Sequence, residues 1–173
     1  CSSDLFDNNL FEFFEKFKLV QVRFSLDDIQ QWHEYQRYPS IWAHWENTWK
    51  YFLDNHPHNT IPSVNRTVGI LNIARLSELD QWINKYKLTR FDDNIELIDH
   101  FAFGEYSLDY LTDAHKEYVL QAQGESSRAW SYVKNRKTNN NTLTLQNHIL
   151  FQDDLQSTNL KTVDPNLYSV IFS

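Results

Sequence analysis

Apolar side chains recur along the chain in two alternating patterns. Apolar residues lie three or four positions apart in residues 7–17, as on one face of an amphipathic helix, and residues 19–25 alternate apolar and polar side chains, as in a half-buried strand. Helical spacing returns at 42–52, 76–86 and 112–123, and strand-like runs lie at 63–70 and 94–101. The predicted order is helix, strand, helix, strand, helix, strand, helix, which favours parallel strands with helical crossovers.

Polar residues mark several expected boundaries. Ser40, directly after Pro39, is predicted to cap the helix that begins near Trp42, and Thr112 is predicted to cap the helix that runs to about Gln123. Residues 54–62 are predicted to form a polar loop.

The pattern changes from about Glu125 onward. Residues 134–141 are polar and rich in Asn, so a loop is expected there, and residues 143–155 have the composition of one more helix. Residues 159–173 are predicted to be a tail with a terminal apolar run. We therefore expect two regions: a strand–helix domain over 1–124 and an extension over 125–173.

The first predicted strand has one polar face. Gln21, Arg23 and Ser25 alternate with the apolar residues, whereas a strand covered by helices on both sides is usually apolar throughout. Two interpretations remain open. The polar face lines the wet lumen of a barrel that holds a polar ligand, or the strand lies at a sheet edge with one face in solvent.

Composition narrows the possible classes of protein. The 173 residues include 16% aromatic residues but only 3 Gly and 4 Pro, which favours one packed core over a tight-turn all-β fold. The formal net charge of -7 gives a nucleic-acid partner no electrostatic support, and no apolar run approaches the length of a membrane span. The single cysteine, Cys1, excludes an internal disulfide and suits a reducing compartment, so a cytoplasmic location is expected.

Several short segments follow one another in an order that is similar to one enzyme family. They are Phe24-Ser-Leu-Asp27, Tyr35-Gln-Arg37-Tyr-Pro39, Thr67-Val68 leading to Asn72-Ile73, Leu108 to Lys116, and Leu160 to Leu167. In this order the chain resembles the radical S-adenosylmethionine (SAM) enzymes with a twitch-type C-terminal region.

The resemblance implies an α/β fold, the C-terminal half of a partial (β/α)6 barrel with a short C-terminal helical extension. The three predicted strands would be the fourth to sixth of that barrel, so the N-terminal half would precede Cys1. The parent enzyme would use a [4Fe–4S] cluster to cleave SAM reductively to a 5′-deoxyadenosyl radical, which abstracts hydrogen from an unidentified substrate. This chain would supply part of the SAM and substrate site and be inactive alone, with the missing half of the barrel as its partner.

The chain departs from the family pattern at two places. The Cys-x3-Cys-x2-Cys motif is absent, so the ligands of a [4Fe–4S] cluster do not lie in this chain. Asp28 occupies the position after Ser-x-Asp where the family usually has glycine, a change that affects the geometry expected for this turn.

The resemblance assigns SAM-binding roles to five residues. Ser25 and Asp27 would form hydrogen bonds with the ribose or amino group, Arg37 would hold the carboxylate as a guanidinium fork, and Asn72 would bond the ribose. Arg23, on the same side of the strand as Ser25, would face a ligand or carboxylate in the lumen.

Four of these residues also have a purely structural interpretation. Ser25 or Asp27 could cap the following helix, and Asn72 could be a turn residue. Arg37 could pair with Glu34 or stack on Tyr38 at the surface.

Other chemistry has weaker support in the sequence. His56-Pro-His58 is too small a set for a metal site and is expected to be a solvated loop, and no metal ligand is assigned.

The alternative to a radical SAM enzyme is a standalone, non-catalytic binding or interaction module with a degenerate fold of this kind. A third hypothesis, an α/β enzyme with Asp27 and His33 as an acid–base pair, has no supporting motif.

Overall fold

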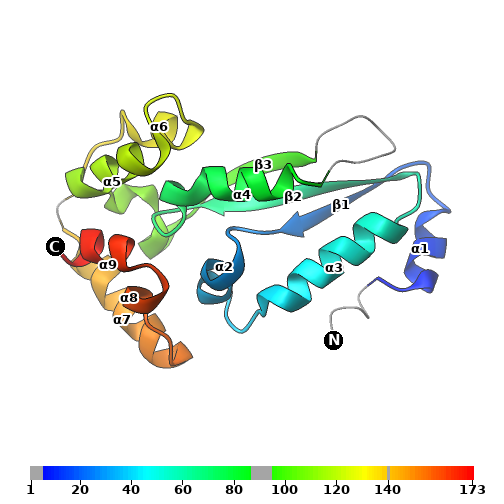
Figure 1. Cartoon of the computed structure of the whole chain (residues 1–173), viewed down its shortest axis with the longest axis horizontal. Helices are drawn as coiled ribbons and strands as arrows, with labels where there is room; N and C mark the ends of the chain where they lie inside the picture. Colours follow the sequence, from blue (N-terminus) through cyan, green and yellow to red (C-terminus); the bar gives the residue numbers. More distant parts are fainter. Residues whose placement is uncertain (1–5, 87–94, 140) are drawn as a thin grey trace. The chain divides into compact units, whose positions relative to one another are not determined.

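The computed structural model describes residues 6–86, 95–139 and 141–173, which form a set of helices and a small sheet (Figure 1). The chain divides into two compact units. The first comprises Cys1–Arg66 and Trp82–Ile98, and the second comprises Thr67–Gln81 and Asp99–Ser173. The predicted division at residue 124 concerns a barrel and its extension, and it stays a prediction.

The sheet has three strands in the order β1 (Val20–Ser25), β2 (Thr60–Val68) and β3 (Glu96–Phe101). β1 and β2 are parallel, in register from the pair Val20 and Thr60 to the pair Ser25 and Asn65. The predicted α/β class with parallel strands and helical crossovers is confirmed. The partial barrel stays a prediction, because the described residues show only this three-stranded sheet.

β1 is an edge strand. The backbone N–H groups of Val20 and Leu26 donate to Asn59 and Asn65, so the even-numbered residues of β1 direct their backbone groups toward β2. In a parallel ladder the backbone groups of the alternate residues, 21, 23 and 25, then point to the free edge. Arg23 and Ser25 have exposed side chains, which agrees with the second interpretation of the polar face.

An aromatic core fills the first unit between β1 and the helix α3 (Trp42–Asn55). Trp49 and Phe52 are fully buried, and the ring of Phe24 packs edge-on against both, with centroids 4.8 Å and 5.0 Å away. Trp82 and Tyr86, 4.9 Å apart, join the same cluster beside Trp49. The spacing of the three Trp in α3 therefore serves packing, as the apolar period predicts.

Two short helices complete the described part of this unit. α1 (Asn8–Phe14) begins at Asp7, whose side chain accepts a hydrogen bond from the N–H of Leu10. α2 (Gln30–Gln36) lies between β1 and α3 and was not predicted.

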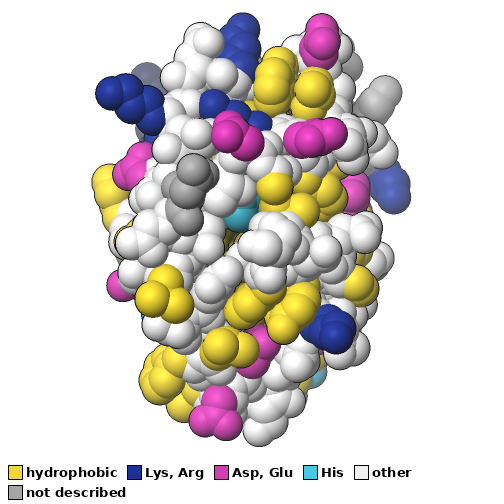
Figure 2. Space-filling view, turned by 90° about the vertical axis from the view of Figure 1, so that its left-hand side faces the viewer, with side chains coloured by type: hydrophobic (Ala, Val, Ile, Leu, Met, Phe, Trp, Pro, Cys, Tyr) yellow, Lys and Arg dark blue, Asp and Glu magenta, His cyan; other side chains and the backbone are white. Residues whose placement is uncertain are grey.

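The second unit is mainly helical (Figure 1). In chain order its elements are η2 (Ile73–Arg75), most of α4 (Leu76–Ile83), η3 (Gly104–Tyr106), η4 (Leu108–Tyr110), α5 (Asp113–Gln123), α6 (Arg128–Val133), α7 (Leu143–Gln156), α8 (Leu160–Val163) and α9 (Pro165–Phe172). Thr112 caps α5 as predicted, and the side chain of His115 accepts from the backbone N–H of Thr112 in return. Figure 2 shows hydrophobic side chains in several small groups among charged residues on the viewed face.

The structure corrects three local predictions. Residues 159–173 are not a tail but the helices α8 and α9. The predicted loop 54–62 is shorter, because α3 extends to Asn55 and β2 begins at Thr60. Ser40 does not cap α3, whose N-cap position is Ile41, without a side-chain hydrogen bond. Within the described ranges, no helix is long and apolar enough to span a membrane.

Candidate functional site

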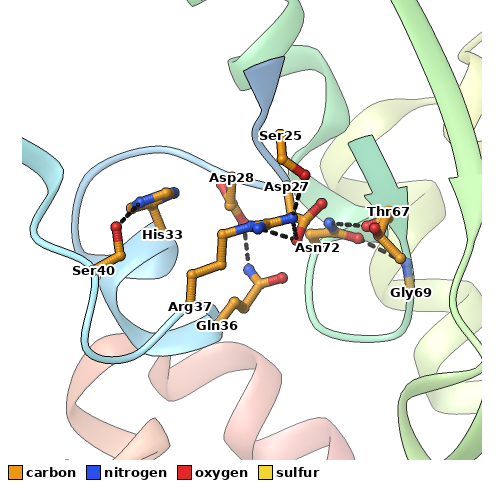
Figure 3. Close-up of polar contacts among 10 residues, drawn as sticks. All are labelled: Ser25, Asp27, Asp28, His33, Gln36, Arg37, Ser40, Thr67, Gly69 and Asn72. Atoms are coloured by element: carbon orange, nitrogen blue, oxygen red, sulfur yellow. Dashed lines mark hydrogen bonds and ion pairs between the residues drawn. The ribbon is translucent and has the colours of Figure 1, made fainter. Parts of the chain in front are cut away.

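Three of the predicted site residues meet at the C-terminal end of β1 (Figure 3). Arg37 donates through Nε to Oδ2 of Asp27 at 2.8 Å, and its Nη2 forms an ion pair with the same oxygen at 2.8 Å. The same Nη2 donates to Oγ of Ser25 at 2.9 Å. One guanidinium therefore links the last residue of β1 to the turn that follows it.

A buried aspartate shapes this turn. Oδ1 of Asp28 accepts from the N–H of Ile29 at 2.9 Å. Its Oδ2 accepts from Nε2 of Gln36 at 3.0 Å (Figure 3), and the two bonds tie the start of α2 to its last residue. The left-handed backbone conformation falls on Gln30, with φ of 53°, and not on Asp28. The turn therefore uses the carboxylate of Asp28 where glycine was expected, and it needs no glycine at this position.

The predicted helix cap and the predicted pair of Arg37 with Glu34 are not found. Neither Ser25 nor Asp27 caps α2, because its N-cap position is Ile29 without a side-chain hydrogen bond. Arg37 pairs with Asp27 rather than with Glu34, whose carboxylate accepts from the backbone N–H of Trp42.

Arg23 lies on the predicted side of β1. It shares a face with Ser25, and its neighbour on β2 in register is Ser63. Its side chain is exposed, and Nη2 donates to Oε1 of Gln21 at 3.1 Å. Arg23 is therefore not buried, and the need for a buried counter-charge does not arise.

Asn72 belongs to the second unit. Its Oδ1 accepts from the N–H of Gly69 at 2.9 Å, and its Nδ2 donates to the carbonyl of Thr67 at 2.8 Å (Figure 3). A Cβ at Gly69 would stand 2.6 Å from the carbonyl oxygen of Tyr106, so this turn requires glycine. Both ends of the Asn72 amide hold the turn, as the structural interpretation of this residue expected.

His33 and Ser40 form a second polar contact, which the sequence pattern missed. Nε2 of the buried His33 lies 2.8 Å from Oγ of Ser40 (Figure 3). Burial, and secondarily the charge of Arg37, lowers the pKa of His33 from 6.5 to about 4, although Asp27 opposes the shift. His33 is therefore neutral at pH 7. Since His33 is bonded to Ser40 and Asp27 to Arg37, the geometry gives no support to an acid–base pair of the two.

A pocket of about 340 Å³ opens beside β1 in the first unit. Phe6, Phe24 and Trp45 form part of its apolar wall, and Arg23, Ser25 and Ser40 also line it. Two of these lining residues take part in the polar contacts described above: Ser25 accepts from Arg37, and Ser40 contacts His33.

The histidines at 56 and 58 do not form a metal site. His56 is buried rather than solvated, and its Nδ1 contacts the carbonyls of Phe52 and Leu53 at 3.0 Å and 3.1 Å at the end of α3. In the described part of the chain, no three His, Cys, Asp or Glu side chains gather as metal ligands would. Cys1 lies outside the described residues.

Comparison with known proteins adds no precedent. No protein-family model, no curated protein and no solved structure matches this chain. A function must therefore be inferred from the residues themselves.

Proposed function

We propose that this chain is the C-terminal part of a radical SAM enzyme and supplies one side of its SAM and substrate site. The observation that carries the proposal is the cluster of Ser25, Asp27 and Arg37 at the C-terminal end of a parallel strand. Ligand sites of parallel α/β proteins gather at this end of the strands. The residues of the cluster are also those on which the family resemblance rests.

The hydrogen-bonding capacity of the cluster suits the polar part of SAM. The hydroxyl of Ser25 accepts from Arg37, so its own proton can be donated to a ribose or carboxylate oxygen. Arg37 has further N–H groups beyond the two that are engaged, and these can hold a carboxylate. Asn72 belongs to the second unit and both ends of its amide hold the turn there, so its role is the weakest of the five.

The residues of this chain do not fit a [4Fe–4S] cluster. Such a cluster needs several thiolates, and the chain has one cysteine. The proposal therefore includes a partner, the N-terminal half of the barrel, that carries the cluster ligands. It also includes a cytoplasmic location, because these clusters and a single free thiol both suit a reducing compartment.

The SAM site can be tested by titrating SAM into the isotope-labelled chain and following backbone amide shifts by NMR. We expect saturable shifts at Ser25, Asp27 and Arg37, and about five-fold weaker binding by Ser25→Ala, the effect of one lost hydrogen bond. The matched control is Ser131→Ala, whose hydroxyl bonds the carbonyl of Arg128 on α6. Unchanged spectra at saturating SAM would overturn the proposed site.

Two observations test the parent activity. The chain alone, with SAM and a strong reductant, is expected to form no 5′-deoxyadenosine, and its formation would contradict the proposal. The coding sequence directly upstream of Cys1 is expected to continue in frame and to encode Cys-x3-Cys-x2-Cys. A start codon there without the cysteine triplet would exclude cluster chemistry.

The second candidate function is a non-catalytic binding module. The observation that favours it is the free edge of β1 with the pocket beside it, which together offer a binding surface without any cluster. The upstream sequence separates the two candidates, because only the enzyme requires the cysteine triplet.

A further inference from the structure

The pocket beside β1 has two serine hydroxyls whose protons are available to a ligand. Oγ of Ser25 already accepts a hydrogen bond from Arg37 at 2.9 Å. An arginine can only donate, so the proton of Ser25 is not used in this contact. Because Ser25 lines the pocket, its hydroxyl can donate to an acceptor that enters there.

The hydroxyl of Ser40 contacts His33, as that of Ser25 contacts Arg37. Neutral His33 carries one ring proton, on either Nε2 or Nδ1. Nδ1 is buried and has no hydrogen-bond partner within the described residues. A buried donor without an acceptor is rarer in folded proteins than an unused acceptor, so the proton belongs on Nε2, which donates to Ser40. The proton of Ser40 then also remains for a ligand.

The charge of the lining is positive. Arg23 contributes a guanidinium that is bonded to the neutral Gln21, and no Asp or Glu is among the described lining residues. The formal net charge of the whole chain is -7, but at physiological salt exposed charges beyond about 8 Å are largely screened. Among the described lining residues, which also include His44 and Thr48, Arg23, Ser25 and Ser40 therefore offer donors to an anionic group.

The rest of the lining is mostly apolar and aromatic. Phe6 and Phe24 are buried among neighbouring rings and Trp45 is half-buried, so together they form an apolar wall. A volume of about 340 Å³ is at the small end of the range of ligand pockets. We propose that this pocket binds a small aromatic carboxylate, with the ring against Phe24 and Trp45 and the carboxylate held by Arg23, Ser25 and Ser40.

This inference does not depend on the proposed function, and it assigns a different ligand to Arg23 and Ser25, which line the pocket. SAM also has an aromatic ring and a carboxylate, but it carries an ammonium and a sulfonium as well. The described lining offers those cations no acidic partner and places Arg23 beside them. A ligand with one negative charge and no positive charge fits this lining better.

The test uses 2-naphthoate as the probe and its neutral amide, 2-naphthamide, as the matched ligand. Titration of each into the isotope-labelled chain is followed by NMR at the amides of Arg23, Ser25 and Ser40 and at the indole N–H of Trp45. For a ligand of this size in an open pocket we expect a Kd of about 0.1–1 mM for the acid. The amide is expected to bind about ten-fold more weakly, and about 0.5 M NaCl should reduce this difference.

Two variants locate the carboxylate. Arg23→Gln is expected to weaken 2-naphthoate binding about five- to ten-fold and to leave 2-naphthamide binding unchanged. Lys50→Gln removes the same charge from α3 at a residue that pairs with Glu46 and is not among the described lining residues, and it should leave both ligands unaffected. The folded state of each variant is checked by the dispersion of the same spectra.

Three results would overturn the inference: no saturable shifts, equal affinity for the acid and the amide, or Arg23→Gln that binds 2-naphthoate like the unaltered chain. A parallel titration with SAM separates this inference from the proposed function. If 2-naphthoate binds and SAM does not, the result supports the carboxylate-binding pocket and contradicts the proposed SAM site. If SAM binds and 2-naphthoate does not, only the carboxylate-binding pocket is contradicted.

Discussion

Arg75 and Asp164 form a buried ion pair although 89 residues separate them in the sequence. Arg75 also donates to the carbonyl of Leu71, and Asp164 accepts from the N–H of Leu167 at the start of α9. The pair therefore fastens the C-terminal helices of the second unit to the segment that follows β2.

Removal of this carboxylate should destabilise the chain strongly. Asp164→Ala leaves the guanidinium of Arg75 buried without its counter-charge and removes the cap of α9, so we expect the free energy of unfolding to fall by about 3–5 kcal/mol. The control, Asp109→Ala, removes the exposed partner of Arg136 and should cost less than about 1 kcal/mol. Urea denaturation measures both, and similar losses in the two variants would contradict the prediction.

Acid should destabilise the second unit through His115. Burial lowers the pKa of His115 from 6.5 to about 4, and Nδ1 accepts from the backbone N–H of Thr112, so the folded state favours the neutral ring. The contribution of neutral His115 to the free energy of unfolding is complete above about pH 6.5. It is lost as the pH falls toward 4, by about 3 kcal/mol in total.

His115→Gln tests this pH dependence. Glutamine at the same position preserves the reciprocal capping with Thr112 but does not titrate, so unfolding free energies measured between pH 7 and pH 4 should depend less on pH. His100, an exposed residue on β3, provides the control His100→Gln, which should retain the full dependence. Equal pH dependence in both variants would show that His115 is not the titrating group.

Replacing Asp28 by glycine should weaken the turn after β1. Asp28→Gly removes the acceptor of two hydrogen bonds and adds backbone freedom to the unfolded chain, so we expect a loss of about 2–3 kcal/mol in thermal or urea unfolding. Gln36→Ala removes only one of the two bonds and should cost less. A neutral or stabilising Asp28→Gly would mean that the carboxylate does not hold the turn.

Arg37→Lys should lower the affinity of the proposed SAM site without a large change in the free energy of unfolding. A lysine ammonium cannot reproduce the guanidinium fork that joins Asp27 to Ser25, so the affinity of the proposed site for SAM should fall about ten-fold. Because Arg37 is partly exposed, the unfolding free energy should change by less than about 1 kcal/mol. Calorimetric titration and denaturation of the same sample measure the two effects, and undiminished SAM binding would exclude Arg37 from the site.

The sequence predicted those helices and strands whose residues do in the fold what their pattern indicates. Strict alternation marked β1, and Thr112 marked the start of α5 because its side chain does cap that helix. α2 escaped prediction because its buried residues, His33 and Tyr35, make no apolar period. α8 and α9 escaped because they are short and begin at Asn159 and Asp164, caps that a polar tail would equally contain.

Three of the residues that the resemblance named lie in contact, but their assignment to a SAM site stays a prediction, and their contacts could not be predicted. The resemblance named Ser25, Asp27 and Arg37, and they do meet, yet nothing in the sequence shows that Arg37 bonds Asp27 rather than Glu34. The contact between His33 and Ser40 was missed because Ser40 occupies a position typical of a helix cap, and only the folded chain brings the imidazole to it. Such pairings depend on tertiary packing, which residue spacing does not encode.

The first unit is made of two separate stretches of chain, and this affects the order in which it can fold during synthesis. Its aromatic core includes Trp82 and Tyr86, which are translated only after the segment Thr67–Gln81 of the second unit. A nascent chain that ends at Arg66 therefore exposes the faces of Trp45 and Trp49 that Trp82 later covers. The first unit cannot complete its core on the ribosome until the other unit has begun to emerge.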